Sequence, residues 1–264
     1  MVPLAAEPIF HIGTFPVTNA LINGWIAVIF FLILGILIRG HATLIPGKLQ
    51  NFIESTLEWL MGYCDQVTGS RVKTERLLPI VASLFLFILF SNWVGLLPGT
   101  GSIGRWEFLE GKMELVPLLR PIGSDLNTTL ALAVFAVTIS HFFGIITIGF
   151  FKHANKFIQL GTLWKSLRKG GISIFVAVIE MGVGLIEIVG EIAKVISLSL
   201  RLFGNVFAGE VLLTVMAGLI PFIVPTPFML LEVLVGIIQA GIFAILTLVY
   251  LTVATTDHAE EEAH

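Results

Sequence analysis

The sequence predicts an all-helical membrane protein with five membrane-embedded helices and one amphipathic helix at the membrane surface. Of its 264 residues, 56% are hydrophobic and only 12% are charged, which is about half the charged fraction of an ordinary soluble domain. The mean hydropathy is +0.97, and several apolar runs exceed the roughly 18 residues that cross a bilayer. Residues 1–264 are therefore expected to form a single integral membrane domain.

The first part of the chain predicts one span followed by a surface helix. Residues 1–20 contain no Lys or Arg, so the basic region of a cleaved signal peptide is missing. The first span is predicted over residues 21–38. After Pro46-Gly47, residues 49–67 place apolar and charged side chains on opposite helical faces, which is typical of a helix lying along the membrane surface.

The second and third spans are predicted over residues 77–97 and 127–151, separated by a loop rich in Gly and Pro. The last two helices are predicted over 173–217 and 227–254. At 1.5 Å per residue these would be about 67 Å and about 42 Å long, whereas the hydrocarbon core is about 30 Å thick. Because both exceed this thickness, we expect a long, steeply tilted hairpin.

The distribution of positive charge predicts the orientation of the chain. Segment 39–76 and loop 152–169 each hold five Lys or Arg residues, whereas loop 98–126 holds three. Strongly basic segments face the cytoplasm. The N-terminus is therefore predicted outside and the C-terminus inside.

The helix over 173–217 carries a row of polar side chains in an otherwise apolar segment. At 100° per residue, six of them share one face, and a seventh, Glu210, lies about 120° away. Each ionised group near the bilayer centre costs about 2.5–3.5 kcal/mol, so a row of them indicates a function. The six are Glu180, Glu187, Glu191, Lys194, Arg201 and Asn205.

The predicted orientation divides the polar side chains into an inner and an outer group, with Arg201 between them. Carboxylates in a partly dry site can take up and release protons, whereas arginine stays protonated and cannot relay them. A fixed cation between two acid-lined paths predicts an ion turnstile that works against a second, moving subunit. The inner acids are Glu180, Glu187 and Glu191, and the outer group is Asn205, Glu210, Glu232 and Gln239.

Three motifs in this sequence resemble subunit a of the F-type ATP synthase. Residues 197–210, SLSLRLFGNVFAGE, resemble the signature of that family. Residues 239–251, QAGIFAILTLVYL, resemble its final helix, and residues 124–133, SDLNTTLALA, resemble its third span. The order of segments in the family covers nearly the whole chain.

The resemblance implies a proton-translocating stator subunit with two offset half-channels. These would carry H⁺ to and from carboxylates on a rotating c ring, against which the last helical hairpin would lie, and Arg201 would prevent a direct leak. Asn205, Glu210, Glu232 and Gln239 would line the outer half-channel and Glu187 the inner exit, with Glu180, Glu191 and Lys194 as further inner candidates. The implied partners are the c ring, the b-subunit stalk, other ATP synthase subunits and the lipid of a bacterial inner membrane.

The sequence departs from the family pattern at two positions. Glu232 stands where some relatives have His, which leaves the proton affinity of the outer relay open. Val195 stands where many relatives have Pro, which leaves the position of a helix kink open.

Each outer polar residue also has a purely structural interpretation. Arg201 could neutralise a neighbouring glutamate, and Glu210 and Glu232 could form a buried hydrogen-bonded pair. Asn205 and Gln239 could join two helices through hydrogen bonds worth about 0.6 kcal/mol each.

Three further residues have structural interpretations too. Lys194 could form an ion pair with Glu191, three residues before it on the same helix. His141 lies on a phenylalanine-rich helix, where we expect a packing residue more than a proton relay.

Several classes of function are not expected. No Gly-rich phosphate loop is present, so we expect no enzyme activity, nucleotide or other cofactor on this chain. The net charge of −3 predicts no nucleic-acid partner, and a single cysteine, Cys64, excludes an internal disulfide and a cysteine-based metal cluster.

Two other functions are alternatives to the proton-translocating subunit. The alternative function is a self-contained, ion-coupled secondary transporter, but such proteins usually contain internal repeats, and the sequence shows no convincing one. A purely structural membrane scaffold would leave the row of polar side chains unexplained.

Overall fold

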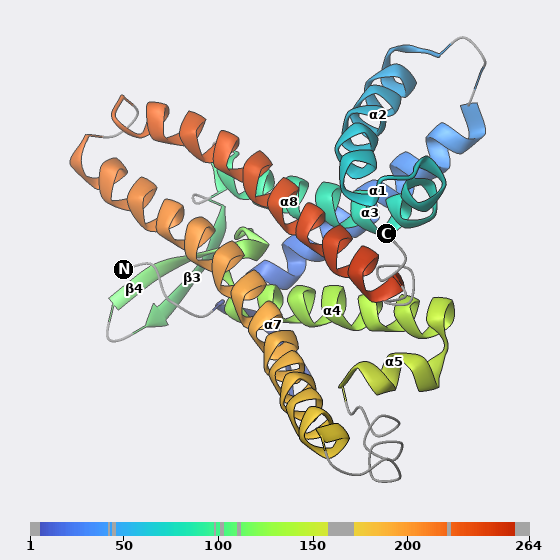
Figure 1. The fold of residues 1–264 in the computed structure, drawn as a ribbon. Helices are drawn as coiled ribbons and strands as arrows, with labels where there is room; N and C mark the ends of the chain where they lie inside the picture. Colours follow the sequence, from blue (N-terminus) through green and yellow to red (C-terminus); the bar gives the residue numbers. More distant parts are fainter. Residues whose placement is uncertain are drawn as a thin grey trace.

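The computed structural model describes residues 6–41, 43, 46–97, 99–100, 103–109, 112–157, 172–220 and 223–256. This part of the chain is mostly helical, as the sequence predicted (Figure 1). Its helices are α1 (Asn19–His41), α2 (Lys48–Thr68), α3 (Arg71–Leu96), α4 (Leu126–Ile148), α5 (Phe150–Phe157), α7 (Ile172–Leu219) and α8 (Pro225–Thr255). A short 3₁₀ helix, η2 (Ile122–Ser124), precedes α4.

Four of the described helices, α1, α3, α4 and α8, are long and apolar enough to cross a membrane. They coincide with four of the five predicted membrane helices. The position of α7 within the membrane stays a prediction, as does the tilt of the C-terminal hairpin. The amphipathic helix is confirmed as α2, which begins and ends within one residue of the predicted bounds.

Two small antiparallel hairpins add strands that the sequence analysis did not predict. β1 (Pro8–Ile12) pairs with β2 (Phe15–Thr18), and β3 (Gly104–Leu109) pairs with β4 (Lys112–Pro117). Gly13 has a φ of 64° between β1 and β2, a conformation in which glycine avoids the Cβ penalty of other residues. The segment 98–126, predicted as a loop only, therefore contains a hairpin.

Helix α4 begins and ends at identifiable signals. The Asp125 side chain caps it, accepting hydrogen bonds from the Asn127 backbone N–H (3.2 Å) and from the Thr128 hydroxyl (2.6 Å). Gly149, with a φ of 93°, ends it, so the span is shorter than the predicted 127–151. The chain then forms α5 at the start of the segment predicted as a basic loop, the rest of which, residues 158–171, lies outside the described residues.

The core lies where α3, α4, α7 and α8 meet. Small side chains permit this close approach of helices. Ala133 on α4 and Ala240 and Ala244 on α8 are fully buried. Helix α7 contributes Leu198, Leu202 and Val206, which are spaced four residues apart on one face.

Helices α7 and α8 form the predicted antiparallel hairpin (Figure 1). With 48 residues, α7 is about 72 Å long. It passes through Val195 as one helix, although Figure 1 shows that it changes direction along its length. Its C-terminal half runs beside α8, while its N-terminal half extends towards α5.

Candidate functional site

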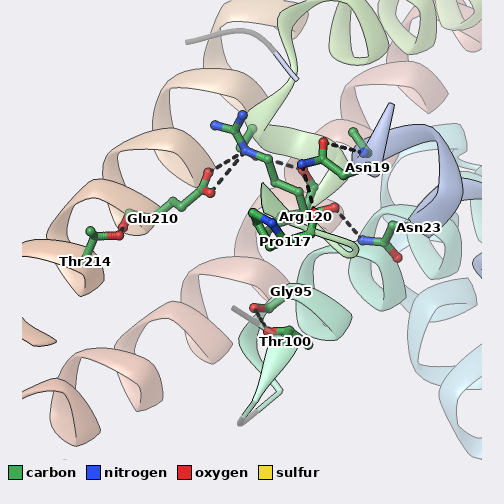
Figure 2. A network of polar contacts seen from close by, with 11 residues as sticks. Asn19, Asn23, Gly95, Thr100, Pro117, Arg120, Glu210 and Thr214 are labelled. Atoms are coloured by element: carbon green, nitrogen blue, oxygen red, sulfur yellow. Dashed lines mark hydrogen bonds and ion pairs between the residues drawn. The ribbon is translucent and has the colours of Figure 1, made fainter. Parts of the chain in front are cut away.

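The C-terminal half of α7 takes part in an ion pair between two side chains from distant parts of the chain. Arg120, in the segment just before η2, donates from Nε to both carboxylate oxygens of Glu210, each at 3.1 Å (Figure 2). The Arg120 side chain is only 2% exposed and that of Glu210 is 23% exposed. Removing one partner of such a buried pair leaves the other charge uncompensated.

Two asparagines on α1 fix the segment that carries Arg120 (Figure 2). The Asn23 side-chain amide donates to the Arg120 carbonyl and to the Ser91 carbonyl on α3, both at 2.9 Å. The Asn19 amide donates to the Pro117 carbonyl at the end of β4, at 3.3 Å. Because both asparagines are fully buried, α1 acts as a rigid support for this segment.

The ion pair borders a cavity of about 470 Å³. Four charged residues from different parts of the chain line it: Glu7, Arg120, Glu210 and Glu232. The cavity thus brings together Glu210 and Glu232, which the sequence analysis had placed in one outer group. The two carboxylates make no hydrogen bond to each other among the described residues, so the interpretation as a directly bonded pair does not match the structure.

The position of Glu232 depends on a glycine in the facing helix. Glu232 on α8 is half-buried, and a Cβ atom at Gly209 on α7 would collide with its carboxylate. The Glu232 carboxylate therefore occupies the space that a side chain at position 209 would need. Its neighbour Glu210 faces Arg120 instead, so the two acids enter the cavity from opposite helices.

Arg201 occupies a different face of α7 from Glu210. It is exposed, and its Nη2 donates to the Ser197 hydroxyl at 3.3 Å. Large apolar side chains that flank the polar row are exposed as well, including Ile196 (49%) and Leu200 (52%). Within the described residues, Arg201 forms no ion pair. The structure therefore does not support the interpretation that Arg201 neutralises a neighbouring glutamate.

The other predicted outer residues do not join the cavity. Asn205 is exposed and Gln239 is partly buried, and neither lines the cavity. Neither side chain makes a hydrogen bond to any part of the chain that the structure describes. The interpretation of these two amides as a link between helices is therefore not what the structure shows.

In the N-terminal half of α7, some of the residues predicted for the inner group contact one another and others do not. Lys194 Nζ lies 2.6 Å from Glu191 Oε1, so the pair considered from their spacing is present. Glu191 also contacts His141 of α4. Glu187 is partly exposed, and the side chain of Glu180 lies outside the described residues.

The ATP synthase A chain family matches residues 21–252 of this chain. The chain belongs to this family. The protein named ATP synthase subunit a of Moorella thermoacetica is 33% identical over 243 residues, covering 92% of this chain and 93% of the relative. The protein of the same name from Mycobacterium ulcerans is 34% identical over 252 residues, covering 94% and 90%. That of Geotalea daltonii is 33% identical over 236 residues, covering 88% and 86%.

Membership of the ATP synthase A chain family agrees with the four apolar helices, and the chain is an integral membrane protein. The site of this family member contains no arrangement suited to a metal ion. Within the described residues, no group of three or more His, Cys, Asp or Glu side chains is placed to bind one. The cavity instead holds the carboxyl groups of Glu210 and Glu232 near the guanidinium of Arg120.

The sequence analysis missed Arg120, which it counted only as one charge of a loop. One signal was available, because Arg120 follows Val116-Pro-Leu-Leu119 and precedes Pro121-Ile122, and an isolated arginine in an apolar run requires a partner. Its partner lies 90 residues later in the sequence. No pattern in the sequence around Arg120 could therefore have identified Glu210 as its partner.

Proposed function

We propose that this chain is the proton-translocating stator subunit of a rotary ATP synthase, forming one membrane domain. Two offset half-channels carry H⁺ to and from the carboxylates of a c ring. Arg201 keeps these half-channels from joining. The chain itself catalyses no bond chemistry and binds no cofactor.

The observation that carries this proposal is the exposed guanidinium of Arg201 on α7, in a polar row that is flanked by exposed apolar side chains. A charge that faces lipid costs several kcal/mol at the bilayer centre, so this face requires a cover that brings negative charge. A ring of carboxylate-bearing helices supplies both the apolar contact and the charge. Because arginine stays protonated, each passing carboxylate releases its proton before it crosses.

The cavity lined by Glu210 and Glu232 fits the outer half-channel. Both acids come from the hairpin that carries Arg201, and Glu210 is nine residues from Arg201, which is about 14 Å along the helix. Asn205 and Gln239 lie between the cavity and the middle of the hairpin and, under this proposal, extend the path towards the ring. The count of basic residues places this end of the hairpin outside.

The inner half-channel is assigned to the opposite end of α7. Glu187 and Glu191 lie 14 and 10 residues before Arg201, about 21 Å and about 15 Å along the helix. Lys194 lies between Glu191 and Arg201. The c ring, the b-subunit stalk and the remaining subunits are the proposed protein partners, in a bacterial inner membrane.

The experiment is to replace Arg201 by Ala in the complete complex and to measure ATP-driven acidification of inverted membrane vesicles. Pumping and proton-driven ATP synthesis are expected to be lost, while the amount of assembled complex stays near that of the wild type. Ser197→Ala is the matched control, because it removes the hydroxyl that Arg201 contacts but keeps the guanidinium. A complex with Arg201→Ala that pumps at the wild-type rate would contradict the proposal.

Purification separates the proposal from the transporter alternative. A stator subunit should copurify with a ring of small hairpin subunits and should not drive substrate uptake alone. A secondary transporter would be active when this chain alone is reconstituted into lipid vesicles.

A further inference from the structure

A second polar cluster lies on the inner half of the molecule, away from the cavity. It joins three helices through His141 on α4, His153 on α5, and Glu191 and Lys194 on α7. His141 Nδ1 lies 3.2 Å from His153 Nε2, and His141 Nε2 lies 3.4 Å from Glu191 Oε2. His141 is therefore held between an imidazole and a carboxylate.

These contacts determine which nitrogen of His141 carries hydrogen. An ionised carboxylate only accepts hydrogen bonds, so Nε2 of His141 is the protonated nitrogen when it faces Glu191. Nδ1 of the neutral ring then accepts from the Nε2–H of His153. His153 is buried, with only 6% of its surface exposed, and so holds the ring of His141 in one tautomer and one orientation.

The charged and titratable groups around His141 come from each helix of the cluster. Helix α5 contributes His153, and α7 contributes Glu191 and Lys194. Helix α8 contributes Tyr250, over whose ring Lys194 Nζ lies at 5.0 Å from the centroid. Lys194 keeps its own contact with Glu191 at 2.6 Å, so an imidazolium at His141 would share this carboxylate with one ammonium group.

We propose that His141 is a proton-transfer residue of the inner half-channel, with Glu191 as its partner on α7 and His153 as the residue that positions it. This inference rests on the proposed function, since it needs protons to leave the ring beside α7. The His141 side chain is 28% exposed and that of Glu191 is 18% exposed, so the cluster is open at the protein surface, and Glu191 lies on the same helix as Arg201.

The transfer changes only N–H and O–H bonds. In the pumping direction, the hydrogen bond from His153 opens and a proton from the inner water binds to Nδ1 of His141 in its place. Glu191 stabilises the imidazolium, and the proton on Nε2 then passes to the Glu191 carboxylate, which leaves a neutral His141 with its hydrogen on Nδ1. The reverse order carries a proton out during ATP synthesis. Imidazole suits this step because it gains and loses charge between about pH 5 and 8.

The test uses inverted vesicles with the complete complex, in which the inner face of the protein meets the bath. His141→Phe keeps an aromatic ring for packing but removes both nitrogens, and it is expected to slow ATP-driven acidification by about tenfold or more. Adding imidazole to the bath should restore part of the rate. His153→Gln, which leaves His141 present but less firmly oriented, should shift the bath-pH profile and leave pumping measurable.

Three comparisons decide the outcome. His141→Gln is the second variant, to be used if His141→Phe assembles poorly. It keeps a polar side chain of similar length but cannot be protonated as an imidazole can. Wild-type rates in both His141 variants, with an unchanged bath-pH profile and no response to imidazole, would overturn the relay. If Arg201→Ala still blocks pumping in that case, only the relay fails, whereas normal pumping by Arg201→Ala would remove the proposed function itself.

Discussion

Arg120 Nε lies 3.1 Å from each carboxylate oxygen of Glu210, although the two residues are 90 positions apart in the sequence. The pair joins the segment before α4 to the C-terminal half of α7 and borders the cavity that Glu232 also lines. Because the Arg120 side chain is almost fully buried, the Glu210 carboxylate offsets part of the cost of burying its charge. Neutralising Glu210 would remove that compensation and weaken the pair.

The first prediction concerns this ion pair. Glu210→Gln should lower the stability of the protein by about 3–5 kcal/mol, because it removes a counter-charge from the buried guanidinium. Thermal unfolding of the detergent-purified complex, followed through this subunit, measures the effect.

The matched variant removes both charges. Arg120→Leu with Glu210→Gln should recover much of the stability lost in the single variants, since no uncompensated buried charge remains. Its proton conduction should stay low, because an ionisable group of the outer cavity is gone. Stability effects that simply add in the double variant would show that the two side chains do not depend on each other.

The second prediction concerns Asn23, which supports the Arg120 segment. Asn23→Leu keeps the approximate volume but removes the hydrogen bonds to the Ser91 and Arg120 carbonyls. Leaving these carbonyls without a donor should cost about 1–3 kcal/mol, and proton conduction should fall along with it. Asn51→Leu on the exposed face of α2 is the control and should leave the melting temperature nearly unchanged.

The third prediction concerns the contact between α7 and α8 at Gly209. Gly209→Ala should displace the Glu232 carboxylate, since an added Cβ atom has no room, and should lower ATP-driven pumping several-fold. Gly218→Ala, on the same helix, meets nothing within 4 Å and should pump normally, with a gain of up to about 1 kcal/mol in helix propensity.

A compensating change identifies the cause of the Gly209→Ala defect. Glu232→Asp shortens the acid by one methylene group and should restore part of the pumping in the double variant. If the shorter acid gives no recovery, the defect arises elsewhere than at the Glu232 carboxylate.

The helices could be predicted from the sequence because their signals are local. Apolar runs extend over consecutive residues, and the polar row on α7 follows from helical geometry alone. The break at Gly149 was missed, because the predicted span continued to residue 151. Glu232 and Gln239 were both predicted in the outer group, and they are seven residues apart, so they share one face of α8. The sequence did not show that Glu232 lines the cavity and Gln239 does not. That difference depends on which neighbours pack against α8.

The contacts that complete the site could not be predicted because they join distant segments. The hydrogen bonds of Asn23 cross 68 and 97 positions of sequence, and the His141–His153 contact depends on the turn at Gly149 that brings α5 back against α4. The sequence analysis expected His141 to be a packing residue. The structure gives it two polar partners, and its role as a relay stays a proposal.

The last prediction concerns Cys64 on α2, whose thiol is buried against the α3–α8 side of the core. Burial, with a smaller contribution from the charge of Asp65, raises the pKa of the Cys64 thiol from 9.0 to about 11. A raised pKa favours the neutral thiol, and only the thiolate reacts with maleimides. At pH 8 the thiolate fraction should therefore be about 100-fold smaller than that of an ordinary cysteine.

Labelling of the native protein with N-ethylmaleimide, followed by mass spectrometry, should be correspondingly slow and should accelerate about tenfold per pH unit up to the raised pKa. Tyr63→Cys combined with Cys64→Ala is the control, since position 63 is 44% exposed, and this thiol should react rapidly at pH 8. Equal labelling rates at the two positions would mean that α2 does not pack against the core as the structure shows.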